Sequence, residues 1–323
     1  MSVIEHRTPS LRSFPLWLGA KVFLKPVLTY WPISDLGLSP LRLIDQAFSM
    51  LPTDKSVVRQ SITLAGRPAD LITPQGPSGR DTDTAVLYLH GGAFVVAGPA
   101  THRYLGVAMA QELELPLYSL DYRQLPGAGV GTSVVDAVNA YRELIVDRGF
   151  RRVVLAGDSA GGYLCGKVIE AAYRDGLPTP VVYVGFSPLL DLDLADHEDR
   201  DSDKDAYIPK SKLAELAPKF DRGPEPLVGE RRIIDVPVEA FPPTILITAQ
   251  DEFLEPDAID LVDSLSREGV LAHLHTFAWQ VHAFPVASGL PEAREAIRLS
   301  ADFARAALAT GRAAVVDSGS VAG

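Results

Sequence analysis

The chain of 323 residues contains a single cysteine, Cys165, and fewer basic than acidic side chains. A lone cysteine excludes a disulfide within the chain and fits a reducing compartment, so we expect a cytoplasmic protein. The 41 Asp and Glu residues outnumber the 30 Lys and Arg residues, which gives a formal net charge of −11. Because binding to a phosphate backbone needs a basic face, we expect no nucleic-acid partner.

A long uninterrupted apolar run is also missing. The most apolar stretch, residues 14–28, contains two prolines and two lysines, so it is too short and too charged to span a bilayer. No clear cleavage site follows it, which argues against a secretory signal. We therefore expect residues 1–55 to form short helices of a cap. The alternative that stays open is a surface that touches lipid.

From about residue 56, short apolar runs alternate with longer stretches of helical periodicity. The apolar runs are residues 85–89, 117–120, 152–156, 181–186, 244–248 and 272–277. The helical patterns are residues 133–147, 162–174, 258–268 and 292–308. Apolar strands separated by helices predict a mostly parallel sheet with helices on both faces. Such a sheet carries its site at the carboxyl ends of the strands.

One stretch departs from this alternation. Residues 188–235 are acidic, contain prolines and lack a strand pattern, so we expect an insertion that helps to form a cap over the site. The predicted organisation is therefore an N-terminal cap segment over 1–55 and a catalytic domain over 56–312. We expect residues 313–323 to be a disordered tail.

The sequence Gly-Asp-Ser-Ala-Gly at residues 157–161 directly follows a predicted strand and directly precedes a predicted helix. This context indicates the nucleophile elbow of an α/β-hydrolase fold, with Ser159 as the nucleophile. The backbone amide of Ala160 starts the helix and is expected to stabilise an oxyanion. Cys165 lies on the same helix without an adjacent base, and we expect it to be a packed core residue.

A second motif, His-Gly-Gly-Ala-Phe at residues 90–94, follows a strand upstream of the serine. Glycines allow this loop to approach a substrate closely, so Gly91 and Gly92 are the expected oxyanion donors together with Ala160. His90 precedes the serine, whereas this fold orders its triad as serine, acid and histidine. We therefore expect His90 to hold the loop.

The base must come from the four histidines that follow Ser159 in the sequence. His197 lies in the acidic insertion, and His273 and His275 lie within a predicted strand. His282 follows that strand on the side where the site is expected, so it is the predicted base.

For the acid, Asp251 is nearest to the end of the strand over 244–248 and is the predicted residue. Glu252, Glu255 and Asp257 stay as alternatives, although Asp257 is better placed to cap the next helix.

Taken together, the motifs at 90–94 and 157–162, the segment around Asp251 and the sequence from His282 resemble the hormone-sensitive lipase family of esterases and lipases. The resemblance covers residues 60–310. It implies an α/β-hydrolase fold with a helical cap, action on acyl esters of short or medium chain, and no cofactor. Two positions depart from the family pattern. Ala93 replaces a third glycine, and the segment over 122–127 lacks the usual glutamate, which puts the anchoring of the oxyanion loop in doubt.

The predicted function is hydrolysis of small acyl esters through an acyl-enzyme. The alternatives are an amide hydrolase that uses the same triad and a non-catalytic small-molecule receptor on the same scaffold. Aspartates at alternate positions from 199 to 205 match the first ligands of a calcium loop. However, Lys204 and Lys210 occupy the positions that need glycine and glutamate, so we expect no metal. For the oligomeric state, a homodimer is kept as an alternative to a monomer.

Overall fold

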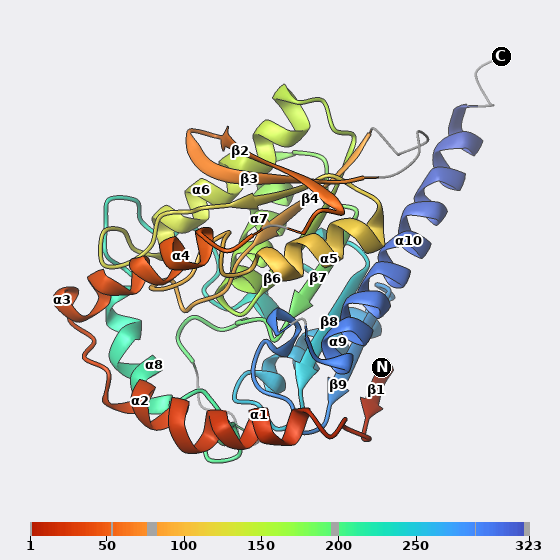
Figure 1. The fold of residues 1–323 in the computed structure, drawn as a ribbon. Helices are drawn as coiled ribbons and strands as arrows, with labels where there is room; N and C mark the ends of the chain where they lie inside the picture. The colour runs from red at the N-terminus through yellow and green to blue at the C-terminus, as the bar shows by residue number, and fades with distance from the viewer. Residues whose placement is uncertain (1, 53, 76–82, 195–199, 288, 320–323) are drawn as a thin grey trace.

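The computed structural model describes residues 2–52, 54–75, 83–194, 200–287 and 289–319 (Figure 1). A nine-stranded sheet with the order β1-β9-β8-β7-β6-β4-β5-β3-β2 runs through the described residues. Its strands are β1 (Ser2–His6), β2 (Val57–Leu64), β3 (Arg67–Pro74), β4 (Thr84–Leu89), β5 (Leu117–Leu120), β6 (Arg152–Asp158), β7 (Val182–Phe186), β8 (Thr244–Ala249) and β9 (Ala272–Phe277). Neighbouring strands are parallel, except that β3 is antiparallel to β2 and β5.

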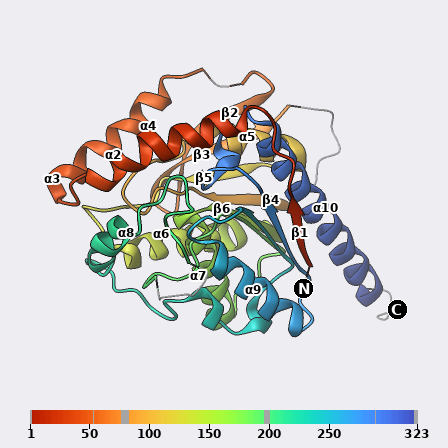
Figure 2. The ribbon, with the colours of Figure 1, turned by 90° about the horizontal axis from the view of Figure 1, so that it is seen from below.

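Helices cover the sheet on both faces (Figure 2). One face packs against α5 (Arg103–Leu113) and α10 (Pro291–Gly319). The other face packs against α6 (Val130–Arg142), α7 (Ala160–Asp175) and α9 (Glu255–Arg267).

Alternate residues of a central strand enter the two cores. In β6, Val153 and Leu155 belong to one hydrophobic cluster, and Val154 and Ala156 belong to the other. Because successive side chains of a strand point to opposite faces, a strand buried on both sides must be apolar throughout. This explains why the central strands were visible in the sequence as uninterrupted apolar runs, and it confirms the α/β class.

The N-terminal helices are α1 (Ser13–Gly19), η1 (Ala20–Leu24), α2 (Lys25–Tyr30), α3 (Asp35–Leu38), η2 (Ser39–Leu41) and α4 (Arg42–Ser49). They lie outside the sheet, and α8 (Lys210–Leu216) of the insertion lies against α2 (Figure 1). The ammonium group of Lys21 donates to the backbone oxygen of Asp203, and that of Lys25 donates to the backbone oxygens of Ser202 and Asp205. These bonds join the N-terminal segment to the insertion.

The structure differs from the sequence-based expectation at both ends. Residues 2–6 fall in the segment expected to form helices, but they form β1 and pair in parallel with β9. The hairpin of β2 and β3 and the helix α5 were not predicted. Helix α10 continues to Gly319, whereas a disordered tail was expected from residue 313; residues 320–323 lie outside the described ranges. No helix of the described residues is both long enough and apolar enough to cross a bilayer.

Two histidines lie in contact where β1 pairs with β9. His6 Nε2 lies 3.0 Å from His275 Nδ1, and the His6 ring stacks on Phe277 with the centroids 4.0 Å apart. Burial, together with the charges that His6 and His273 would carry, lowers the pKa of His275 to about 4. Burial also lowers the pKa of His6, against an opposing effect of Glu295.

We predict that acid loosens β1. A histidine whose pKa in the folded state lies below its ordinary value of 6.5 stabilises the fold fully above pH 6.5, and this contribution is lost as the pH falls toward 4. Hydrogen-exchange protection of residues 3–6, corrected for the intrinsic rate, should therefore fall over this range. In His6→Phe, which keeps a ring over Phe277 but cannot titrate, the loss should be smaller. Identical pH profiles for the two proteins would contradict the prediction.

Candidate active site

Ser159 occupies the sharp turn between β6 and α7. Its backbone has φ 48° and ψ −120°, a conformation that non-glycine residues rarely adopt. A Cβ on Gly157 would come within 2.6 Å of the carbonyl oxygen of Gly161, and one on Gly161 would collide with the carbonyl of Leu89. The small residues that flank the serine are therefore required by the turn, as the motif predicted.

His282 lies on the loop after β9, and its partner is Glu252. Nδ1 of His282 is 2.9 Å from Oε2 of Glu252, and both side chains are buried. Asp251, the predicted partner, is instead exposed and lies 3.8 Å from Lys204. The expectation that Asp251 contacts His282 is wrong by one residue.

The backbone explains this offset. Asp251 has φ 61°, and its amide donates to the carboxylate of Glu255. This left-handed turn directs Asp251 into solvent and the following carboxylate, Glu252, toward the interior. Asp257, another alternative for the acid, pairs with Arg200 at 2.6 Å.

Burial and mutual contact set the protonation of the pair. Burial raises the pKa of Glu252 to about 7, although the hydrogen bond and the charge of His282 oppose the shift. Burial would lower the pKa of His282, but the hydrogen bond and the charge of Glu252 outweigh it and raise that pKa. With Nδ1 engaged by Glu252, the remaining nitrogen Nε2 is the one that can exchange a proton with a substrate or a hydroxyl.

The loop after β7 connects the serine to the histidine. The amide of Ser159 donates to the carbonyl of Phe186 at 3.0 Å, and the next residue, Ser187, accepts the amide of Ala283 at 2.9 Å. Tyr207 of the insertion stands over the histidine, with its ring centroid 5.7 Å from that of His282. Residues from four separate segments of the chain therefore meet beside the elbow.

The oxyanion loop is held by the residue that precedes the serine. The amide of Gly91 donates to Oδ1 of Asp158 at 2.9 Å, so it is not available to an oxyanion. The expectation that Gly91 is a donor is thus not supported by the structure, because a buried carboxylate takes its N–H. Gly92 and Ala160 are the predicted donors that remain. Gly92 has φ 112°, which a side chain would disfavour, and the following Ala93 has φ 52°.

Asp158 is the centre of a buried network. It also accepts hydrogen bonds from the hydroxyl of Tyr88 at 2.5 Å and from Nε2 of His102 at 3.2 Å. Burial would raise the pKa of Asp158, but the charge and hydrogen bond of His102 outweigh it and lower the pKa, so the carboxylate is ionised. Nδ1 of His102 lies 3.0 Å from the hydroxyl of Thr101, which in turn donates to Asp45 of α4. The network thus extends from the elbow to the N-terminal helices.

The segment over 122–127 anchors the oxyanion loop without the glutamate that is usual in the family. The hydroxyl of Tyr122 donates to the carbonyl of His90 at 2.7 Å, and the amide of Leu125 donates to that of Phe94 at 2.8 Å. Gln124 Nε2 donates to the carbonyl of Ala97 at 3.1 Å. His90 stacks on Tyr122 and bonds the carbonyl of Gly91 through Nδ1, so it contacts the loop as expected.

No group of three or more His, Cys, Asp or Glu side chains within the described ranges is placed to hold a metal ion. Asp199, the first residue of the calcium-like spacing, lies outside those ranges. The carboxylate of Asp205 accepts the backbone amides of Tyr207, Ile208 and Phe253, so it serves the fold of the insertion.

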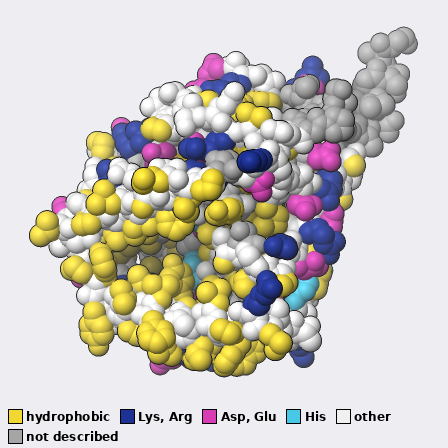
Figure 3. All heavy atoms as spheres, viewed as in Figure 1, with side chains coloured by type: hydrophobic (Ala, Val, Ile, Leu, Met, Phe, Trp, Pro, Cys, Tyr) yellow, Lys and Arg dark blue, Asp and Glu magenta, His cyan; other side chains and the backbone are white. Residues whose placement is uncertain are grey.

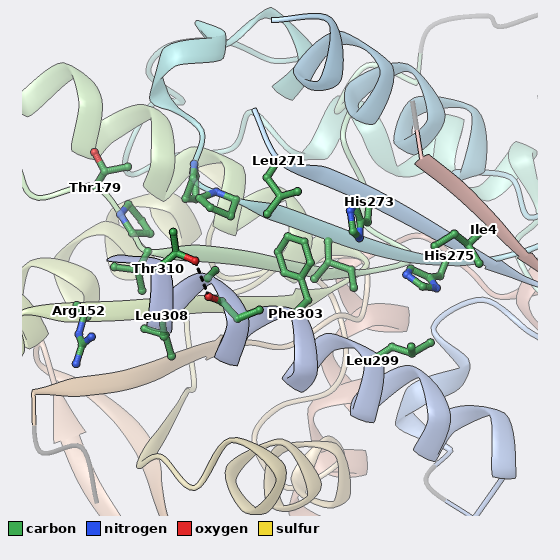
Figure 4. Close-up of a pocket in the computed structure, with 17 residues that line it drawn as sticks. Ile4, Arg152, Thr179, Leu271, His273, His275, Leu299, Phe303, Leu308 and Thr310 are labelled. Carbon is green, nitrogen blue, oxygen red and sulfur yellow. Dashed lines mark hydrogen bonds between the residues drawn. The ribbon is translucent and has the colours of Figure 1, made fainter. Parts of the chain in front are cut away.

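An apolar pocket of about 880 Å³ lies away from this site (Figure 4). Its walls come from α10 and from the amino ends of β8 and β9, and they include Leu271, His273 and Phe303. Ser159 and His282 follow the carboxyl ends of their strands. The pocket is therefore at the opposite end of the sheet and takes no part in the chemistry of the elbow.

Comparison with known proteins agrees with the fold. Residues 86–286 match a family model described as the alpha/beta hydrolase fold. The carboxylesterase/phospholipase LipF of Mycobacterium tuberculosis is 33% identical over 95% of this chain and 84% of its own length. The esterase LipU of the same organism is 31% identical over 88% of this chain and 99% of its own length.

A solved structure gives the same result. The crystal structure of an esterase from the bacterial hormone-sensitive lipase family superposes with a TM-score of 0.78 and 26% identity, over 92% of this chain and 99% of that one. The chain therefore belongs to the α/β-hydrolase family. Within it, the chain is a member of the hormone-sensitive lipase group and is a serine hydrolase that acts on ester bonds.

We predict that Glu252→Gln lowers kcat for a soluble ester by about 10³- to 10⁴-fold, because the variant loses the charge that stabilises the imidazolium. The base must be neutral to act, so activity in the wild type should rise with pH through a pKa above 6.5. Without the carboxylate, burial dominates and lowers the pKa of His282, so the acidic limb of kcat/KM should move to lower pH.

Asp251→Asn is the matched control for this variant. Because Asp251 is exposed and does not contact His282, we expect a change in kcat of less than about twofold. A larger loss of kcat in Asp251→Asn than in Glu252→Gln would restore the original assignment.

Proposed function

We propose that the chain hydrolyses esters of short- and medium-chain carboxylic acids through Ser159, His282 and Glu252. The observation that carries the proposal is the 2.9 Å contact between His282 and Glu252. Both side chains are buried. The loop that carries His282 is bonded to Ser187, and the residue before Ser187, Phe186, accepts the amide of Ser159. A histidine fixed by a buried carboxylate and a serine on a strained turn are the groups that nucleophilic acyl transfer needs.

In the proposed mechanism, Nε2 of His282 takes the proton of Ser159 as the hydroxyl attacks the ester carbonyl. Glu252 holds the imidazole and stabilises its positive charge, and the amides of Gly92 and Ala160 donate to the oxyanion. His282 then protonates the leaving alcohol, which gives an acyl-enzyme. A water molecule, deprotonated by the same histidine, releases the acid and restores Ser159.

Ser159→Ala tests this assignment. We predict a fall in kcat of about 10⁴- to 10⁶-fold with an unchanged melting temperature, because the hydroxyl is needed for the covalent step. A fluorophosphonate probe should label the wild type at Ser159 and fail to label the variant. Turnover close to that of the wild type in a pure preparation of Ser159→Ala, or labelling at another residue, would contradict the mechanism.

The acyl range is proposed from the apolar cap, with support from the names of relatives, which include an acetyl-hydrolase of Streptomyces hygroscopicus. Each methylene buried under the cap adds about 0.8 kcal/mol, or about fourfold in kcat/KM. We predict that kcat/KM for p-nitrophenyl esters rises from acetate and falls again before decanoate, where extra atoms clash with the pocket wall. A flat profile would contradict an acyl pocket built by the cap.

Amide hydrolysis remains the alternative activity for the same triad, and matched p-nitroanilides separate the two. The proposal expects the ester of each pair to be cleaved faster. The compartment also stays a proposal. We assign the protein to the cytoplasm because Cys165 is buried and unpaired.

A further inference from the structure

The N-terminal helices expose many large apolar side chains. Within the described residues, most of the exposed large hydrophobic side chains fall between residues 11 and 51. Leu11 is 97% exposed, Tyr30 85% and Phe23 73%. We call the exposed apolar side chains of residues 11–51, together with Trp279, the N-terminal apolar surface. Figure 3 shows hydrophobic side chains crowded over these helices, around a hollow in the molecule.

This surface is continuous with the loop that carries the base. Trp279, three residues before His282, is 47% exposed and packs edge-on against Phe14 and Trp17 of α1, with ring centroids 5.5 and 5.1 Å apart. Exposed apolar side chains therefore reach from the outer helices to the site of ester hydrolysis. Large exposed apolar areas on soluble proteins mark binding surfaces.

The charge of this segment differs from that of the whole chain. Residues 11–51 contain four basic side chains, Arg12, Lys21, Lys25 and Arg42, against two acidic ones, Asp35 and Asp45, and the stretch from α1 to α2 contains no acidic residue. Lys21 and Lys25 hold the insertion through its backbone, and Arg12 is exposed at the start of α1. Helices that combine exposed aromatic and aliphatic residues with basic but no acidic residues suit the boundary between lipid head groups and acyl chains.

We infer that the N-terminal apolar surface docks on a lipid surface, with the entrance of the active site facing the lipid. The position of the surface favours lipid over a second copy of the chain. A second copy bound to this surface would cover the hollow that the apolar side chains surround. A lipid layer instead contains acyl esters next to that hollow. The inference extends the proposed function, since it names lipid esters in a layer as a source of substrate.

The distribution of tryptophan allows a direct test. The chain has three tryptophans: Trp17 lies on α1, Trp31 directly follows α2, and Trp279 lies on the loop that packs against α1. Trp17 and Trp31 are half-buried and Trp279 is exposed, so their fluorescence reports on the N-terminal segment and on the loop that packs against it. The full chain carrying Ser159→Ala is mixed with phosphatidylcholine vesicles that contain phosphatidylglycerol, so binding is measured without hydrolysis.

We expect this protein to float with the vesicles and its tryptophan emission to be quenched when the phosphatidylcholine is brominated. Adding Phe23→Ser and Val27→Ser should weaken the partition by at least about tenfold, because two apolar side chains no longer enter the lipid. The matched control adds Val146→Ser and Tyr173→Ser, which change exposed residues outside the surface, and should partition like the parent protein. Circular dichroism and melting temperature check that each variant is folded.

Several results would overturn the inference. These are no partition of the parent protein, an equal loss of partition in the control, or binding without quenching of tryptophan. A dimer in sedimentation that dissociates in Phe23→Ser/Val27→Ser, with no vesicle binding, would assign the surface to a second copy. If that double variant does not fold, Leu11→Ser with Tyr30→Ser replaces it. None of these readouts depends on Ser159, so a failure of docking is distinct from a failure of the proposed mechanism.

Discussion

The buried carboxylate of Asp158 is the interaction on which the rest of the site depends. It directly precedes the nucleophile and binds the amide of Gly91, the hydroxyl of Tyr88 and Nε2 of His102. A charge held away from water is stable only when donors surround it, and these donors come from β4, from the loop directly after it and from the residue directly before α5. The same contacts fix the oxyanion loop relative to the elbow. The hydrogen bonds that satisfy the buried carboxylate therefore also set the geometry that catalysis needs.

Around that centre, the parallel sheet brings together loops that are distant in sequence. The strands β6, β7, β8 and β9 are neighbours, and the loops at their carboxyl ends carry Ser159, Ser187, Glu252 and His282 in turn. None of these loops contains the whole site. They are joined by the bonds of Ser159 to Phe186, of Ala283 to Ser187 and of His282 to Glu252. Tyr207, from the insertion, closes the group over the histidine. The acid–base pair is therefore shielded from water by an element that is separate from the sheet.

The central strands, the elbow and the histidine could be predicted because each depends on local sequence. Continuous apolar runs indicate buried strands, and the Gly-Asp-Ser-Ala-Gly turn leaves little choice of conformation. The acid could not be chosen between Asp251 and Glu252, because the left-handed backbone of Asp251 decides which carboxylate turns inward. Gly91 was wrongly predicted as an oxyanion donor for a similar reason, since its amide is taken by the carboxylate of Asp158, 67 residues away in the sequence. The strand β1 depends on a partner at the far end of the chain, and five residues carry no periodic signal strong enough to predict it.

The position of β1 has a consequence for how the protein can be divided. The chain enters the sheet at residues 2–6, leaves it to form the N-terminal helices, and returns at β2, so these helices form a loop between two sheet strands. Cutting them away from the N-terminus would also uncover the outer edge of β9, whose unpaired backbone groups could then pair with another chain. A chimaera that takes its N-terminal helices from a relative should therefore be joined after His6 and before Val57. A swap made there would keep both edges of the sheet intact while replacing the surface that surrounds the active site.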